Sequence, residues 1–310
     1  MIIYKLIFSK IKRIIYILAF ILSIFYFLSS KKNILLLKGF VSDIEYQLKY
    51  CKIENYLKIC DNNKFKNDEK VYKKVKNPKV SILSPIFNRE RFIIRLLNSI
   101  RYQKFEDIEI IFIDDYSTDN SVNELKKLMK SDNRIILLKN LKTKGTLISR
   151  NIGGLYAKGK YLILPDPDDI FSKDILRICY KVSEKYNYEM IKFNMYLGNK
   201  ELHYEKYSHD KANTEIYQPD LSMYCFYGGD ELRVIDSNLT NKFIKKEIFL
   251  RALNIINRFY LNEYMISMED SMINFILHKT AKSLYFIKII GYNYIKHSQS
   301  IKIMNLIYHS

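Results

Sequence analysis

From residue 79 onward, short apolar runs alternate with stretches in which apolar residues recur at helical spacing. Short apolar runs are typical of buried strands, and apolar residues three and four positions apart are typical of one face of a helix. The pattern predicts strands at 80–87, 108–113, 135–138 and 161–164, and helices at 89–103, from 117 or 119 to 130, and at 147–157. This alternation predicts an α/β fold in which a mostly parallel sheet is covered by helices on both faces.

Two of the expected strands end in acidic residues. Asp114 and Asp115 follow the second strand, and the run Asp-Pro-Asp-Asp at 166–169 follows the fourth. Carboxylates this close repel one another unless a cation or protonation compensates, and hard oxygen ligands suit Mg²⁺ or Mn²⁺. A plainer interpretation is that these are acidic loops that cap helices, one of them starting near Ser172. Because ligands of such sheets bind beyond the carboxyl ends of the strands, where both clusters arrive, a binding site is favoured.

The N-terminal part of the chain has a different pattern. Residues 14–30 carry no charge, are rich in Ile, Leu and Phe, and are flanked by basic residues. A membrane helix needs about 20 predominantly apolar residues, with about 17 as the lower limit, so this run predicts a single-pass anchor within 1–32. A cleaved signal peptide is the alternative, but its small-residue cleavage site is poorly defined, and the flanking charges leave the orientation open. We expect a stem at 33–78, a globular domain at 79–301 and a short tail at 302–310.

The composition is strongly basic. The chain of 310 residues carries 51 Lys and Arg against 33 Asp and Glu, a formal charge of +18. Lysine is abundant throughout, together with Asn, Ile and Tyr, which indicates a general bias rather than one basic patch, and we expect no nucleic-acid partner. The four cysteines have no CxxC spacing and no nearby histidine pairs, which argues against a structural zinc site.

Five segments, in order, resemble those of a known family. They are VSILSPIFNRERFIIRLLNSIRYQKFEDIEIIFIDDYSTDNS at 80–121, SRNIGGLYAKGKYLILPDPDD ending at Asp169, NLTNKFIKKEIF at 238–249, MEDSMINFILHKT at 268–280 and GYNYIKHSQSI at 291–301. Together they are similar to family 2 glycosyltransferases of the GT-A fold, over about residues 80 to 301. The resemblance implies a Rossmann-like nucleotide-sugar fold and transfer of a sugar from a nucleotide-diphosphate donor to an acceptor hydroxyl of a glycan, lipid or protein. It also implies inversion at the anomeric carbon and dependence on a divalent metal, Mn²⁺ or Mg²⁺.

The resemblance assigns donor-binding roles to five residues. Pro85 and Asn88 would border the nucleotide base, and Asp115, with Asp114, would accept hydrogen bonds from the base or ribose. Arg150 would approach the diphosphate or orient a carboxylate. Each has a plainer alternative, because the aspartates could cap a helix and the arginine could be a solvated helix residue.

The metal and the catalytic base are assigned in the same way. Asp166 and Asp168 form the Asp-x-Asp element that holds the metal and the donor diphosphate, with Asp168 the more direct ligand. His297 would approach the metal or the diphosphate, and Asp270 would be the catalytic base. Asp270 could instead cap its helix, and His297 could be a packed or surface histidine.

Two residues depart from the family pattern. Tyr116 stands where the family usually has Gly, which would strain the turn if that position requires a positive φ. Pro167 stiffens the Asp-x-Asp loop but leaves both carboxylates available. The competing interpretations are a nucleotidyltransferase, disfavoured because no glycine-rich loop follows the first strand, and a catalytically inactive, membrane-anchored protein that binds sugar nucleotides.

Overall fold

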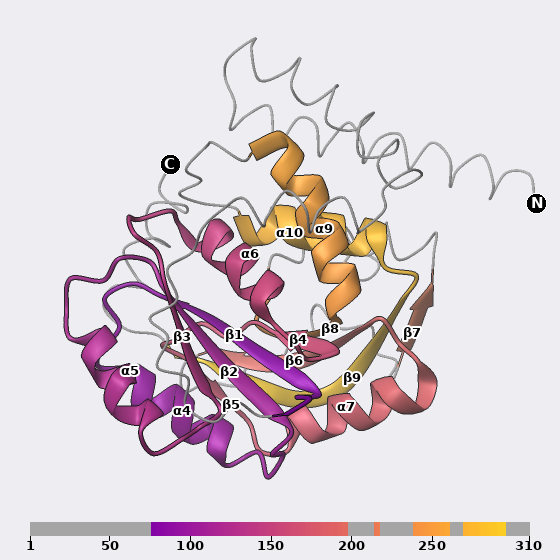
Figure 1. Ribbon diagram of the computed structural model, residues 1–310. Helices are drawn as coiled ribbons and strands as arrows, with labels where there is room; N and C mark the ends of the chain where they lie inside the picture. The colour runs from indigo at the N-terminus through magenta and orange to yellow at the C-terminus, as the bar shows by residue number, and fades with distance from the viewer. Residues whose placement is uncertain (1–75, 198–213, 218–237, 261–268, 296–310) are drawn as a thin grey trace, which may run out of the picture. The chain divides into compact units, whose positions relative to one another are not determined.

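The computed structural model of the protein describes residues 76–197, 214–217, 238–260 and 269–295 (Figure 1). The helices are α4 (Ile93–Arg101), α5 (Ser121–Met129), α6 (Thr146–Tyr156), α7 (Ile175–Tyr186), α9 (Lys246–Tyr260) and α10 (Glu269–Thr280). The strands are β1 (Val80–Ile86), β2 (Ile108–Asp114), β3 (Ile135–Lys139), β4 (Tyr161–Ile163), β5 (Ile170–Phe171), β6 (Met190–Leu197), β7 (Thr214–Tyr217), β8 (Lys242–Lys245) and β9 (Ser283–Tyr294).

The strands form one mixed sheet in the order β3-β2-β1-β4-β8-β6-β9-β5, with β7 also paired to β9. The four predicted strands, β1 to β4, are mutually parallel, as is the β6–β9 pair. The other four pairings among the described strands are antiparallel. The predicted α/β class is confirmed, but the expectation of a mostly parallel sheet is corrected. Short or charged strands such as β8, with the sequence Lys-Phe-Ile-Lys, show no clear strand pattern in the sequence. β8 runs antiparallel to its neighbours β4 and β6.

Helices cover both faces of the sheet. Figure 1 shows α6, α9 and α10 on one side and α4, α5 and α7 on the other. Successive strand residues point to opposite faces, so Ile82 belongs to the core with the α4 and α7 residues, whereas Leu83 lies towards α6. Gly153 lets α6 lie close to the sheet, because a Cβ there would stand 2.8 Å from Ile113 Cδ1. This close packing fixes α6, and with it Arg150, over the carboxyl half of the parallel strands.

Strand order reverses at β1. The chain moves from β1 to β2 and β3 on one side, then returns to place β4 on the other side of β1. In open α/β sheets, such a reversal opens a crevice at the carboxyl ends of the strands. Pro85 is compatible with this position: β4 is paired with β1 only as far as Ile82, so the missing N–H breaks no ladder hydrogen bond.

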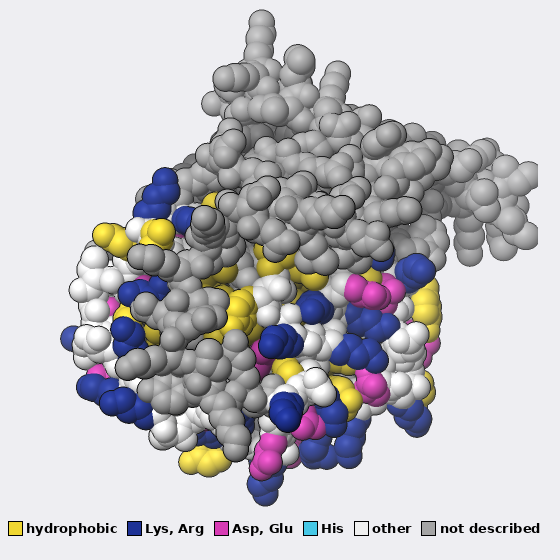
Figure 2. Space-filling view, viewed as in Figure 1, with side chains coloured by type: hydrophobic (Ala, Val, Ile, Leu, Met, Phe, Trp, Pro, Cys, Tyr) yellow, Lys and Arg dark blue, Asp and Glu magenta, His cyan; other side chains and the backbone are white. Residues whose placement is uncertain are grey.

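The predicted location in a membrane is corrected. Among the parts of the chain that the structure describes, no helix is long and apolar enough to cross a bilayer. The run at 14–30 on which that prediction depended lies outside those parts, as do the stem up to residue 75 and the tail. On the face seen in Figure 2, Lys and Arg side chains are spread among acidic ones rather than gathered in a single patch.

Candidate active site

Arg150 joins two acidic segments that are far apart in the sequence. It lies in α6 with 2% of its side chain exposed, and its Nη2 stands 3.2 Å from Asp166 Oδ1, beyond β4. Its Nη1 donates a hydrogen bond to Oδ1 of Asp270, in the first turn of α10. The two carboxylates are about a third exposed, at 34% and 30%. A buried guanidinium therefore holds two solvent-accessible carboxylates side by side.

A different arginine lies beside the second carboxylate of the Asp-x-Asp element. The Nε of Arg89, which follows β1, is 3.8 Å from Oδ2 of Asp168. Arg95, in α4, donates from Nη2 to the backbone carbonyl of Asp168. The acidic loop is thus bordered by α6 on one side and by the β1–α4 connection on the other.

Asp169 attaches the acidic loop to the end of β9. Its side chain is fully buried, and Oδ1 accepts a hydrogen bond from the Ile295 N–H at 2.8 Å, just after β9. Burial, and then the charges of Asp166 and Asp168, raise the pKa of Asp169 to about 8. The hydroxyl of Tyr292 in β9 accepts a hydrogen bond from the Asp166 N–H at 2.9 Å. Asp169 was predicted as part of the acidic cluster but was given no role of its own, and Tyr292 was not predicted as a site residue.

Asp115 organises the connection between β3 and α6. Its Oδ1 accepts hydrogen bonds from Asn140 Nδ2 at 2.7 Å and from the Lys144 N–H at 2.8 Å, and its Oδ2 accepts one from the Gly145 N–H at 2.9 Å. Gly145 has φ 87°, a conformation that favours glycine, and directly precedes α6. Both oxygens of Asp115, which was predicted to contact the nucleotide, therefore hold the loop that leads into α6. Arg150 lies about one turn into that helix.

Asn88 ties the loop after β1 to the loop after β2. Its Oδ1 accepts hydrogen bonds from the N–H groups of Thr118 at 2.9 Å and Asp119 at 3.3 Å. Its own N–H donates to Ser117 Oγ at 3.0 Å, and Asp114 Oδ1 accepts from the Ser117 N–H at 3.2 Å. Asn88 and Asp114 thus shape the loop after β2 through hydrogen bonds to its backbone.

Tyr116, in the same loop, has φ 69°. Tyr116 therefore adopts the positive φ that the family's usual glycine would adopt without strain. Its side chain is 54% exposed at the rim of the site.

The structure brings together Asp166, Arg150 and Asp270 by direct contact, and places Asp168 two residues from Asp166 in the same loop. His297 lies outside the described residues. Within the described segments, no group of three His, Cys, Asp or Glu side chains is placed to hold a metal by itself. Two carboxylates nevertheless fit Mg²⁺ or Mn²⁺, which commonly bind one or two protein carboxylates and complete their shell with substrate phosphates and water.

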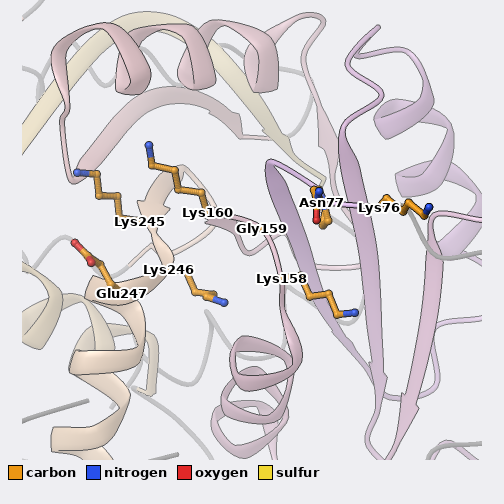
Figure 3. A pocket seen from close by; sticks show the side chains of 9 residues that line it. Lys76, Asn77, Lys158, Gly159, Lys160, Lys245, Lys246 and Glu247 are labelled. Carbon is orange, nitrogen blue, oxygen red and sulfur yellow. The ribbon is translucent and has the colours of Figure 1, made fainter. Parts of the chain in front are cut away.

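A lysine-lined cavity of about 750 Å³ lies at the amino ends of the parallel strands, at the end of the sheet opposite the acidic residues. Figure 3 shows the side chains around it, which come from residues 76–78, 158–160 and 245–247, before β1 and β4 and after β8. Three of its lysines already have protein partners: Lys160 pairs with Glu184, Lys245 bonds Asn187, and Lys246 donates to a backbone carbonyl. This cavity is at the amino ends of β1 and β4, away from the acidic edge.

Together, the strand-order reversal and the acidic carboxyl edge define the class: a Rossmann-like α/β fold of the GT-A type, with a candidate site at the carboxyl ends of the strands. The profile of glycosyl transferase family 2 matches residues 81–247, more than half of the chain, and the chain belongs to this family. The family and enzyme class predicted from the sequence are thereby confirmed.

Relatives and solved structures agree with this assignment. The GalNAc(5)-diNAcBac-PP-undecaprenol beta-1,3-glucosyltransferase of Campylobacter jejuni is 31% identical over 177 residues, 56% of each chain. Glycosyltransferase GlyG of Streptococcus pneumoniae is 33% identical over 127 residues, 38% of this chain and 42% of its own length. The chain spans less than half the length of several such relatives, 18% in a Rickettsia felis glycosyltransferase.

Solved structures of other proteins share the fold. S. aureus TarS 1–349 in complex with UDP-GlcNAc has a TM-score of 0.58 at 19% identity, over 71% of this chain and 59% of that one. The mannosyltransferase PcManGT from Pyrobaculum calidifontis, in complex with GDP-Man and Mn²⁺, has a TM-score of 0.52 at 12% identity, over 88% and 70%. At these identities the likeness establishes the fold alone.

Proposed function

We propose that the protein transfers a sugar from a nucleotide-diphosphate donor to an acceptor hydroxyl, with inversion and with the help of a divalent cation. The observation that carries this proposal is the contact of buried Arg150 with both Asp166 and Asp270. It joins the donor-side loop to the helix that bears the base in one network. The family match at 81–247 lies inside the proposed domain at 79–301.

On the donor side, Asp166 and Asp168 would hold Mn²⁺ or Mg²⁺ together with the diphosphate. When bound, the cation neutralises negative charge on the departing nucleoside diphosphate. The loop is prepared for this role because Asp169 and Tyr292 attach it to β9, so the two carboxylates need little reordering when ligands arrive. The Mn²⁺ and GDP-Man in PcManGT, and the UDP-GlcNAc in TarS, support a donor of this chemical class.

On the acceptor side, Asp270 would take the proton from the attacking hydroxyl. A carboxylate within hydrogen-bond reach of that hydroxyl acts as a general base, and the exposed third of Asp270 leaves access for it. Arg150 orients this carboxylate through a charge-assisted hydrogen bond. One in-line displacement, with base and leaving group on opposite faces of the sugar, gives inversion without a covalent intermediate.

The name of one relative supports a class of acceptor. The C. jejuni relative is named for an undecaprenol-linked glycan with a diphosphate linkage, which supports a glycan acceptor, free or lipid-linked, for this chain. A protein acceptor remains the alternative outcome of an acceptor screen.

Asp270→Asn in the full chain tests the assignment, because it keeps the shape of the side chain but removes the base. With Mn²⁺ and a donor selected from a nucleotide-sugar panel, we expect transfer to fall by a factor of about 10² or more while donor affinity changes little. Asp107→Asn is the matched control, since Asp107 is half exposed and precedes β2 at the amino edge. Full activity of Asp270→Asn would refute the base, and a wild-type chain that binds no nucleotide sugar with Mn²⁺ would refute the function. Binding without turnover would favour the inactive binding protein.

A further inference from the structure

Arg89 was not predicted as a site residue, yet its guanidinium lies between the two loops that frame the donor site. Its Nη1 donates to the carbonyls of Phe87 at 3.2 Å and Asn88 at 3.1 Å. Its backbone N–H donates to Ser121 Oγ at 2.9 Å, so its main chain is fixed at the end of β1. From this base the side chain reaches to within 3.8 Å of the Asp168 carboxylate.

The Arg89–Asp168 pair is loose, unlike the Arg150 contacts. Its separation is near the outer limit for an ion pair, and the two side chains are 30% and 16% exposed. Pairs of this kind contribute little stability, so little is lost when the guanidinium changes partner. Arg95, by contrast, bonds the backbone carbonyl of Asp168 rather than its carboxylate.

Asp168 cannot serve both positive charges equally well. A divalent cation bound at the Asp-x-Asp carboxylates would repel a guanidinium on the same carboxylate. The diphosphate that arrives with the donor is a suitable new partner, because a planar guanidinium binds phosphate oxygens through two parallel hydrogen bonds. Arg89 needs only to rotate its side chain, since its main chain is already anchored.

We propose that Arg89 is a donor-binding residue that exchanges partners: it neutralises Asp168 before ligands bind and then binds the donor diphosphate. This inference rests on the proposed function and extends it, because it assigns the residue that links cation binding to donor binding. If Arg89 exchanges partners in this way, its removal should change the affinities for the cation and for the nucleotide in opposite directions. The cation alone binds more tightly, and the nucleotide in the presence of the cation binds more weakly.

The test uses the full chain with Arg89→Gln, and Arg91→Gln as the matched control, because Arg91 is an exposed arginine two residues away. Binding of Mn²⁺ alone is measured by electron paramagnetic resonance of free Mn²⁺. Binding of UDP or GDP, whichever the wild type binds, is measured by calorimetry at saturating Mn²⁺. We expect Arg89→Gln to bind Mn²⁺ about threefold more tightly and the nucleotide about tenfold more weakly, the loss that a bidentate charged contact implies. Arg91→Gln should change neither.

Arg89→Lys keeps the charge but not the fork of donors, so it should keep wild-type Mn²⁺ affinity and lose part of the nucleotide affinity. This variant also carries the test if Arg89→Gln does not fold. A shift of both affinities in the same direction, or behaviour equal to Arg91→Gln, overturns the exchange. Failure of the proposed function is distinguishable, since then the wild type itself binds no nucleotide with Mn²⁺.

Discussion

At the scale of single residues, Tyr116 stores local strain beside the site. Its φ of 69° lies in the left-handed region, which costs an L-residue roughly 1–2 kcal/mol, and its side chain is 54% exposed. Tyr116→Gly should raise the free energy of unfolding by about 0.5–1 kcal/mol, because the relief exceeds the extra entropy of an unfolded glycine. Chemical denaturation followed by circular dichroism measures this change.

Tyr102→Gly is the control for that substitution. Tyr102 is also exposed but has φ −73°, an ordinary right-handed conformation at the end of α4. There glycine relieves nothing and should lower the free energy of unfolding by about 1 kcal/mol. Equal destabilisation by both substitutions would show that the Tyr116 turn is unstrained.

The sequence predicted which residues gather at the site better than what each one contacts. Asp166 and Asp270 both contact Arg150 in the structure, and their predicted roles stay predictions. Asp115 was expected to face the nucleotide, yet both its oxygens bond the loop before α6. A carboxylate at a strand end has the same sequence pattern in both roles, and the backbone N–H groups that select between them come from residues 144 and 145. Arg89 was missed for a similar reason, since its partner lies 79 positions further along the chain.

At the scale of elements, Asp132 fixes the turn between α5 and β3. Burial alone would raise the pKa of Asp132, but the hydrogen bonds and charge of Arg134, with a further bond from Arg101, lower it to about 2. The unfolded carboxyl has a pKa of 3.8, so the unfolded chain binds more protons between these values. The contribution is therefore present above about pH 4 and lost as the pH falls towards 2; it amounts to about 2 kcal/mol.

Asp132→Asn should therefore lower the free energy of unfolding by about 2 kcal/mol at neutral pH, and the difference from wild type should vanish near pH 2. Urea denaturation over pH 2–7 measures it. In Asp107→Asn, which loses only an exposed pair with Lys79, the loss should stay below about 1 kcal/mol. A difference for Asp132→Asn that does not depend on pH would refute the linkage.

Gly159 sets the close approach of the loop before β4 to β1. A Cβ at this position would lie 2.6 Å from Ser81 N and 2.7 Å from Val80 C, backbone atoms of the central strand that cannot move aside. Gly159→Ala should lower the free energy of unfolding by about 3 kcal/mol, the upper range for overpacking. Thermal denaturation measures the loss.

Gly153→Ala is the comparison for that substitution. Its Cβ would meet Ile113 Cδ1, the flexible end of a side chain, at 2.8 Å, and alanine gains about 1 kcal/mol of helix propensity. Its net loss should therefore be the smaller of the two. A larger loss for Gly153→Ala would show that β1 adapts more easily than the interface of α6 with the sheet.

The first half of the fold was predictable and the second half was not, for physical reasons. β2 is buried along its whole length and β1 at every residue except Pro85, so both sequences are predominantly apolar. β5 has two residues and β8 carries a lysine at each end, so neither shows a strand period. Lys242 is nonetheless buried, because its ammonium donates to the carbonyl of Asn238, a contact that the sequence pattern does not reveal.

At the scale of the whole molecule, the two ends of the parallel strands differ in their charged side chains. The carboxyl edge holds the aspartates after β2 and β4, and the amino edge holds the lysine-lined cavity. An anionic donor would therefore meet repulsion at the carboxyl edge, despite the net charge of +18, unless a cation and the local arginines compensate. On the proposed function, this arrangement would link donor binding to cation binding.

Thermal stability should report that linkage. A donor at a hundredfold excess over its Kd adds about 2.7 kcal/mol to the free energy of unfolding, which for a domain of this size is about 5–10 °C in Tm. The whole unit should gain stability, because the site joins α6 and β4 to α10 and β9 through Arg150, Tyr292 and Asp169.

With Mn²⁺ present we expect the donor to give this full shift in Tm, and after removal of the metal with EDTA we expect only a small one. Asp168→Asn should behave with Mn²⁺ as the wild type does with EDTA, whereas Asp107→Asn should keep the full shift. An undiminished shift in EDTA would mean that the arginines alone receive the diphosphate and that the carboxylates serve another purpose.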